Sequence, residues 1–349
     1  MLGRRELIRN MILTSLAVAA TPLSAKHTSS HKVTGHIKPN RLQSGQTVGL
    51  IAPSSNVMEN EGIAYAEDIL KSFGFNVKKG EYLFDRHGYL AGEDMDRAKD
   101  VNMMFADKEV DAIICLRGGY GSPRILPYLD YDIISKNPKV LMGFSDVTAL
   151  LNAIFVKTGL ITFHGPVASQ NFSDYTLEEF KKVLFTPGKH LVAAPPPFEV
   201  SEGKVEKDNR ITNITEGSAE GELIGGNLSL MVKLVGTPYE PSYKDKILFL
   251  EDVAEAPYRV DGMFSHLKLS GRLDQLAGIV FGKWTRCRSS GNTLSLEQVL
   301  FDHLKPLGIP AVRGLMVGHI KDMSTLPIGA MARLDTAKPG IQLLESPVK

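Results

Sequence analysis

The chain has 349 residues, 43% of them hydrophobic, which is enough to fill the cores of about two domains of ordinary size. Its 40 basic and 39 acidic residues nearly balance, so the charge does not favour a nucleic-acid or other polyanionic partner. The two cysteines, Cys115 and Cys287, form no C-x-x-C pair and no disulfide framework.

The first 25 residues have the layout of a secretory signal peptide. Arg4, Arg5 and Arg9 precede an apolar stretch, Met11–Ala20, that is too short to span a bilayer comfortably. Small residues follow as cleavage signals, and the paired arginines permit a twin-arginine export route. We therefore expect a periplasmic protein with no stable membrane anchor, the alternative being an amphipathic helix that stays in place. Residues 26–42 are polar and predict a flexible leader.

Strand-like and helix-like segments alternate between residues 43 and 170. This alternation predicts an N-terminal α/β domain with a parallel sheet, of the Rossmann or flavodoxin-like kind. Ligands bind at the carboxyl edge of such a sheet, so the loops after its strands are candidate site loops. The predicted strands are 47–52, 76–79, 110–116, 140–142 and 161–163; the predicted helices are 61–73, 94–105 and one starting at Asp146, with a helix or turn over 122–129.

Residues 171–215 differ in character and predict a linker, because they contain Pro195–Pro197 and the charged run Glu202–Arg210. Residues 216–349 predict a smaller, mixed α/β C-terminal domain. Its predicted strands are 246–250, 276–281 and 330–334, with a strand-like segment from 311; its predicted helices are 228–234, 258–269 and 296–304.

The segment Val140–Leu150 has the pattern of a nucleophile elbow. A short apolar strand turns at Gly143, presents Ser145 at the corner and continues into a helix. The helix start places free N–H groups beside any oxyanion that forms there. The second glycine of G-x-S-x-G is replaced by Val147, and a simple helix cap by Ser145 or Asp146 is the alternative.

A serine nucleophile needs a base and a group that orients the base. His319 follows a strand-like run and Gly318, so a loop could direct it at the serine, although a surface turn histidine has the same pattern. His164, in H-G-P, is the rival base, and its rigid turn favours a structural or substrate-contacting role. Glu251 ends a strongly apolar strand, where an unpaired carboxylate would cost several kcal/mol, which favours a site role.

The run Arg117–Gly121 predicts an anion cradle, because glycines let backbone N–H groups approach a carboxylate closely and Arg117 supplies charge. The run lacks the spacing of a dinucleotide-binding loop. No H-E-x-x-H and no His/Cys cluster occurs in the sequence, so we expect neither a metal nor a cofactor.

Seven short motifs occur in an order that resembles the LD-carboxypeptidase family, the muramoyltetrapeptide carboxypeptidases. The resemblance covers roughly residues 43–344. The motifs are Ile51–Ser54, Leu116–Gly121, Gly143–Asp146, His164–Pro166, Gly225–Leu228, Phe249–Asp252 and Val317–His319.

This resemblance implies a serine peptidase that releases the terminal D-Ala from the peptidoglycan tetrapeptide by cutting the bond after diaminopimelate. It implies Ser145 as nucleophile, His319 as general base and Glu251 as the residue that orients the base. The family's arrangement, with the serine in the N-terminal domain and the other two in the C-terminal domain, implies an active site between the domains. The backbone N–H of Asp146, with one from the Gly118–Gly119 turn, would form the oxyanion hole, with Gly119 as the expected donor.

The expected partner is a tetrapeptide or muropeptide substrate, and the family implies a homodimer. Candidate substrate contacts are Arg117, Gly118, Asn227 and His164. Well-known family members lack an export signal, so a periplasmic location would be a departure. Three alternatives remain open: a periplasmic peptide- or amino-acid-binding protein without catalysis, an idle scaffold for wall peptides, and a related hydrolase that inactivates peptide–nucleotide antibiotics.

Overall fold

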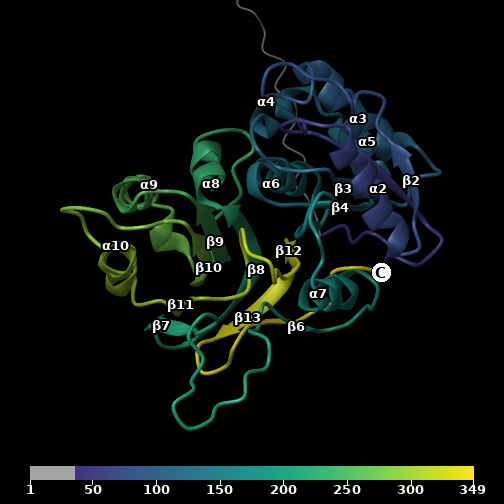
Figure 1. Ribbon diagram of the computed structural model, residues 1–349. Coiled ribbons are helices and arrows are strands. Elements are labelled where there is room, and N and C mark those ends of the chain that lie inside the picture. Colours follow the sequence, from purple (N-terminus) through teal and green to yellow (C-terminus); the bar gives the residue numbers. More distant parts are fainter. Residues whose placement is uncertain (1–35) are drawn as a thin grey trace, which may run out of the picture. The chain divides into compact units, whose positions relative to one another are not determined.

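A computed structural model describes residues 36–349 (Figure 1). The signal peptide expected at residues 1–25, and the leader as far as residue 35, lie outside the described residues. None of the helices between residues 36 and 349 combines the length and the apolar character needed to cross a bilayer.

The first half of the chain forms a six-stranded sheet with the strand order β12-β5-β4-β3-β1-β2. Its first five strands in the chain pair in parallel, and β12 joins antiparallel to β5 from the far end of the sequence. The strands are β1 (Thr47–Ile51), β2 (Asn76–Lys79), β3 (Ala112–Cys115), β4 (Val140–Gly143), β5 (Thr162–His164) and β12 (Leu326–Ile328); the helices are α2 (Glu61–Ser72), α3 (Asp94–Ala106), α4 (Ser122–Ile125), α5 (Tyr131–Lys136) and α6 (Thr148–Thr158).

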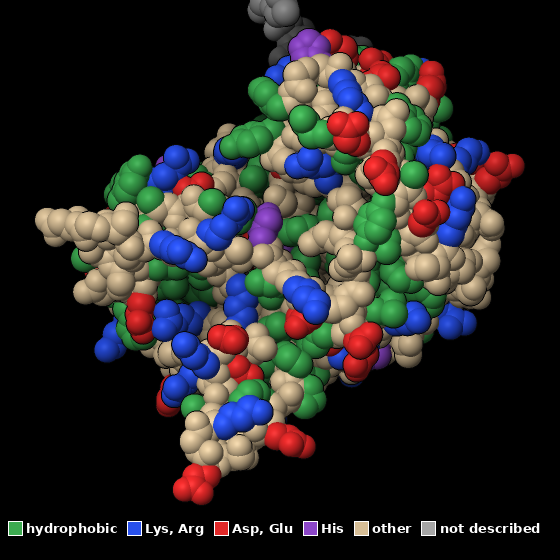
Figure 2. Space-filling view, viewed as in Figure 1, with side chains coloured by type: hydrophobic (Ala, Val, Ile, Leu, Met, Phe, Trp, Pro, Cys, Tyr) green, Lys and Arg blue, Asp and Glu red, His purple; other side chains and the backbone are tan. Residues whose placement is uncertain are grey.

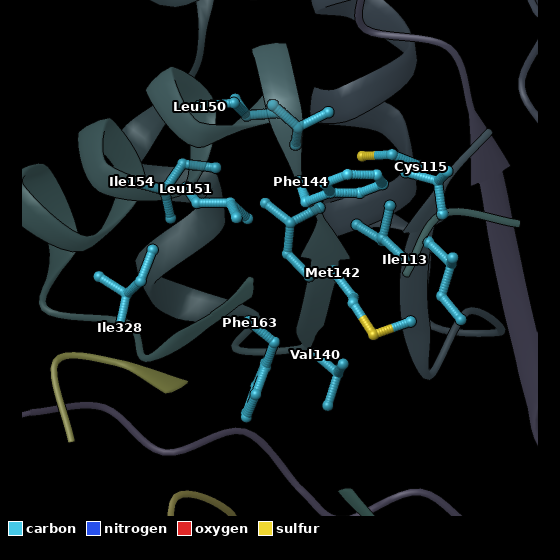
Figure 3. Packing of buried hydrophobic residues seen from close by; sticks show 14 of the residues in the cluster. Ile113, Cys115, Val140, Met142, Phe144, Leu150, Leu151, Ile154, Phe163 and Ile328 are labelled. Carbon is cyan, nitrogen blue, oxygen red and sulfur yellow. The ribbon is translucent and has the colours of Figure 1, made fainter. Parts of the chain in front are cut away.

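The central strands are buried along their whole length. β3 reads A-I-I-C and β4 reads V-L-M-G, and no residue of either strand is exposed. Such continuous apolar runs are typical of parallel strands covered on both faces. Figure 3 shows side chains of these strands, such as Ile113 and Met142, gathered with Leu151 of α6. Each such buried side chain contributes about 1.5–3 kcal/mol to stability, which fixes α6 and the corner before it.

The second sheet has eight strands in the order β6-β14-β13-β8-β9-β10-β11-β7. Its middle strands, β8 to β11, pair in parallel, and antiparallel strands flank them on both sides. The mixed α/β prediction is therefore confirmed. The strands are β6 (Leu191–Val192), β7 (Thr212–Thr215), β8 (Ser218–Asn227), β9 (Ile247–Val253), β10 (Gly278–Thr285), β11 (Ala311–Arg313), β13 (Met331–Asp335) and β14 (Ile341–Leu343); the helices are α8 (Leu228–Leu234), α9 (Pro257–Leu269) and α10 (Leu296–Leu304).

Two expectations about connecting segments are wrong. The flexible leader does not extend to residue 42, because Ile37 bridges to Leu160 and Leu42 is buried, with its N–H bonded to Leu184. The linker contains a full helix, α7 (Asp174–Leu184), capped by the Ser173 side chain. Buried apolar residues on one face hold α7 against the core, so this segment is part of the fold.

Candidate active site

Ser145 stands at a sharp corner between β4 and α6. Its φ of +61° lies in the left-handed region, which is uncommon for a residue with a side chain. A single 3₁₀ turn, Ser145–Val147, then leads into α6. Strained backbone of this kind is concentrated at functional sites, where the surrounding structure maintains it. The strand–corner–helix arrangement expected of a nucleophile elbow is therefore present.

Three side chains from distant parts of the sequence form a hydrogen-bonded chain at this corner. Ser145 Oγ lies 3.0 Å from His319 Nε2, and His319 Nδ1 lies 2.7 Å from Glu251 Oε2. The Glu251 side chain has no exposure, whereas His319 keeps 20% of its side chain exposed. Figure 2 shows histidine surface in a hollow near the centre of the displayed face, with lysine and arginine side chains beside it. The structure thus brings together the three residues for which the sequence suggested a Ser-His-Glu arrangement.

Glu251 is held from both sides. Asn227 Nδ2 donates to Glu251 Oε1 at 3.2 Å and to Asp252 Oδ1 at 2.9 Å. Asp252 Oδ2 in turn accepts from the backbone N–H and the hydroxyl of Ser229, at the start of α8. Both oxygens of the Glu251 carboxylate therefore have a donor, as a buried carboxylate requires. Asn227 is 3% exposed, and its side-chain amide connects the two neighbouring carboxylates.

The Gly118–Gly119 turn lies directly against Ser145, through Gly118. A Cβ on Gly118 would be 2.8 Å from Ser145 Cβ, so no larger residue fits there without displacing the serine. Gly119, the expected oxyanion donor, lies one residue further on, against Ser55. At the corner itself, the first N–H groups of a helix have no intrahelical partner, and Asp146 is among them. The glycine turn, through Gly118, and the helix start, through Asp146, thus both lie next to Ser145.

The Asp146 side chain has a structural task in addition. Its Oδ2 accepts from Ser122 N at 2.7 Å, and its backbone carbonyl accepts from the Ser122 hydroxyl. Burial raises the pKa of this carboxyl, while hydrogen bonds from Ser122 and Ser54 counteract the increase. These bonds fasten the glycine-rich turn to the nucleophile corner.

The sequence matches a known family over most of this architecture. Residues 48–165 match the LD-carboxypeptidase N-terminal domain, and residues 220–334 match the LD-carboxypeptidase C-terminal domain. The chain belongs to the LD-carboxypeptidase family. The two matches include the strands and loops that carry Ser145, Glu251 and His319.

Individual relatives agree with this assignment. A probable murein peptide carboxypeptidase of Bacillus subtilis is 41% identical over 304 residues, which cover 86% of this chain and 92% of that protein. The crystal structure of a muramoyltetrapeptide carboxypeptidase from Oxalobacter formigenes has a TM-score of 0.70 at 32% identity and covers 85% of this chain and 98% of that chain. A microcin C7 self-immunity protein in its wild-type apo state has a TM-score of 0.80 at 29% identity, with coverages of 90% and 100%.

The two remaining candidate substrate contacts of this LD-carboxypeptidase, Arg117 and His164, differ in burial. Arg117 is partly buried, and its Nη1 donates to Asn56 O at 2.9 Å while its Nε donates to Gly118 O at 3.3 Å. His164 has no exposure, and its ring packs edge-on against Phe144 and Phe249. The ring of His164 therefore has no exposed surface for the direct substrate contact expected from the sequence. Burial, together with the charge of the nearby His319, lowers the pKa of the His164 ring to about 3.

The histidine loop of the LD-carboxypeptidase is supported by residues that the sequence reasoning missed. Thr285 Oγ1 donates to His319 O at 2.9 Å, from the end of β10. Thr176 Oγ1, on α7, donates to Lys321 O at 3.0 Å and accepts from Met323 N at 2.9 Å. Nothing in the local sequence marks these threonines, because each acts across more than 30 residues. Among residues 36–349, no group of three or more His, Cys, Asp or Glu side chains is arranged to hold a metal ion.

Proposed function

We propose that this LD-carboxypeptidase releases the terminal D-Ala from peptidoglycan tetrapeptide stems by serine acyl transfer. The single observation that carries the proposal is the continuous chain of hydrogen bonds from Ser145 through His319 to the buried Glu251. The names of the relatives, which include murein peptide and muramoyltetrapeptide carboxypeptidases, support the choice of substrate.

In the proposed mechanism, the Glu251 carboxylate accepts a hydrogen bond from His319 Nδ1–H, which leaves Nε2 unprotonated and able to accept a proton from Ser145. Ser145 Oγ then attacks the carbonyl of the diaminopimelate residue, and a tetrahedral oxyanion forms. Backbone N–H groups of Asp146 and Gly119 stabilise that oxyanion. His319 returns the proton to the amine of the departing D-Ala, and water repeats the cycle on the acyl-enzyme. The Glu251 carboxylate stabilises the imidazolium in both halves of the reaction.

An enzyme that removes only a terminal residue must recognise a free carboxylate. Arg117 is our candidate for this contact, because its Nε and Nη1 donate to backbone oxygens of the glycine-rich turn and of the loop after β1. These two bonds fix the plane of the guanidinium, and its remaining edge can pair with both carboxylate oxygens of D-Ala. Gly118 lets the substrate backbone approach the nucleophile closely.

Export and dimerisation belong to the proposal as well. The signal-peptide layout of Met1–Ala25 supports a periplasmic location, where the enzyme would trim stems of the wall. Fractionation of cells producing the full chain, with detection of a shortened mature protein in the periplasm, tests this part. The homodimer rests on the family resemblance, and sedimentation of the mature protein tests it.

The central experiment is incubation of the purified protein with disaccharide tetrapeptide, followed by mass spectrometry of the products. We expect the loss of one alanine per stem with the wild type and none with Ser145→Ala. A folded wild-type protein that releases no D-Ala would contradict the proposal. Structures of the similar microcin C7 self-immunity protein contain aspartyl sulfamoyl adenosine or glutamyl sulfamoyl guanosine, so a compound of this class is the second substrate to test. Cleavage of that compound alone would favour the antibiotic-inactivating alternative.

A further inference from the structure

Two exposed tyrosines lie side by side next to the glycine-rich turn. Tyr89 is 65% exposed and Tyr120 is 64% exposed, although large aromatic side chains are usually covered. Their ring centroids are 6.1 Å apart, and their planes meet at 71°. The two exposed rings therefore form an open corner, which we call the aromatic corner. Exposed aromatic groups of this kind are typical of binding surfaces.

The loop after β1 holds the backbone of both tyrosines in place. Tyr120 N donates to Ser55 Oγ at 2.9 Å. On the other segment, Asn56 Nδ2 donates to Gly88 O at 3.1 Å and to Leu90 O at 2.9 Å, on either side of Tyr89. The rings are thus presented by a fixed scaffold, which lowers the entropy cost of binding a ligand against them.

The aromatic corner is close to the nucleophile. Gly118 lies against Ser145, and Tyr120 follows two residues later, so its Cα is within about 7 Å of the Gly118 Cα along the chain. The Tyr89 ring, whose centroid is 6.1 Å from that of Tyr120, extends this aromatic surface further. Lys233 of α8 approaches from the second sheet, with its Nζ 5.6 Å from the centre of the Tyr120 ring. A ligand bound at the aromatic corner would therefore extend from the scissile bond at Ser145 outward past the Lys233 ammonium.

We propose that the aromatic corner binds the muramoyl sugar of the substrate while Lys233 faces the carboxylates of the peptide stem. This inference rests on the proposed function. Three residues separate the scissile bond from the sugar in a tetrapeptide stem, a span of roughly 10 Å in an extended chain. The apolar C–H face of a pyranose ring stacks on an aromatic ring, and two rings at an angle can hold one sugar. The enzyme would accordingly prefer sugar-bearing muropeptides to free tetrapeptide.

The test compares two substrates, disaccharide tetrapeptide and the same tetrapeptide without sugar. For each variant, kcat/KM is measured on both by D-Ala release, and the ratio of the two values is the readout. We expect Y89A/Y120A to lower this ratio roughly tenfold, with little change on the free peptide. Tyr120→Phe should keep the ratio because it keeps the ring. Tyr128→Ala is the matched control, since Tyr128 is an exposed tyrosine of another segment.

The outcomes separate this inference from the proposed function. A wild-type ratio in Y89A/Y120A, with both substrates cleaved, overturns the aromatic corner as a sugar site and leaves the peptidase intact. If the wild type releases D-Ala from neither substrate, the proposed function fails. An NMR titration of the protein with peptide-free disaccharide then tests sugar binding by the aromatic corner independently of catalysis. Saturable binding that Y89A/Y120A abolishes supports the sugar site, and absence of binding to the wild type overturns it.

Discussion

Replacement of Glu251 by glutamine isolates the charge of the buried carboxylate, because it keeps the size of the side chain. Glu251 Oε2 lies 2.7 Å from His319 Nδ1, and the side chain has no exposure to solvent. When His319 takes the serine proton, the two side chains become an ion pair. With charge centres about 4 Å apart and an effective dielectric constant of about 20, their attraction is about 4 kcal/mol. Since 1.4 kcal/mol corresponds to a factor of ten in rate, we expect kcat to fall about 1,000-fold.

The assay is D-Ala release from disaccharide tetrapeptide under saturating and limiting substrate. KM should stay within about threefold of the wild-type value, since the lost interaction forms only when the imidazole is charged. Glu297→Gln is the matched control. Glu297, on α10, forms a solvent-exposed pair with Arg313 of β11, so its substitution should leave kcat unchanged. If Glu251→Gln, correctly folded, kept more than a tenth of the wild-type kcat, the reasoning about the ion pair would be refuted.

Three further substitutions test other parts of the site. Gly118→Ala places a methyl group 2.8 Å from the Cβ of the nucleophile, so kcat should fall at least about 100-fold, whereas Gly262→Ala, whose methyl group meets nothing within 4 Å, should keep full activity. Asn227→Ala leaves a carboxylate oxygen of the triad without its donor, at about 1–3 kcal/mol, and should lower both Tm and kcat, the latter about 10- to 100-fold. The pKa of His164 is about 3 in the folded protein and 6.5 in the unfolded chain, so the unfolded chain binds the proton first as the pH falls. The free energy of unfolding therefore decreases between pH 6.5 and pH 3, and the decrease is about 2 kcal/mol at pH 5. Urea unfolding at pH 7 and pH 5 should show this decrease in the wild type and not in His164→Leu.

The candidate triad could be named from the sequence because each member follows a strand or strand-like run. Apolar runs end just before Ser145 and at Glu251, and His319 follows a glycine after such a run. In parallel sheets these positions lie at the edge where ligands bind. That reasoning applies within one sheet, however, and the serine belongs to a different sheet from the acid. Their proximity could be anticipated only from the family resemblance.

Other features left no local signal that could be read. β12 has three residues and pairs with β5 across more than 160 positions, so no periodicity reveals it. The triple proline and the charged run led to the prediction of a linker over the segment that contains α7. The helix is indicated only by the helical spacing of Phe180, Val183 and Leu184, which are buried. The family resemblance alone made Asn227 a candidate substrate contact. Its side-chain amide bonds to two carboxylates that lie 24 and 25 residues further along the chain, and no local pattern indicates these bonds.

The contact between the two sheets explains why the glycine pair is there. The helix that begins at the serine corner, α6, packs directly on β8. Thr148 Oγ1 accepts from Asn227 N at 3.0 Å, and Asn152 Nδ2 donates to Gly225 O at 2.9 Å. A Cβ on Gly226 would be 2.5 Å from Thr148 Oγ1, and its φ of +131° also favours glycine. The backbone N–H of Asn227 bonds to Thr148 of α6, and its side chain bonds to Glu251, so this one residue fixes α6 relative to the acid. The 3.0 Å approach of serine and histidine therefore depends on the packing of α6 side chains against the backbone of β8, which a side chain at Gly226 would prevent.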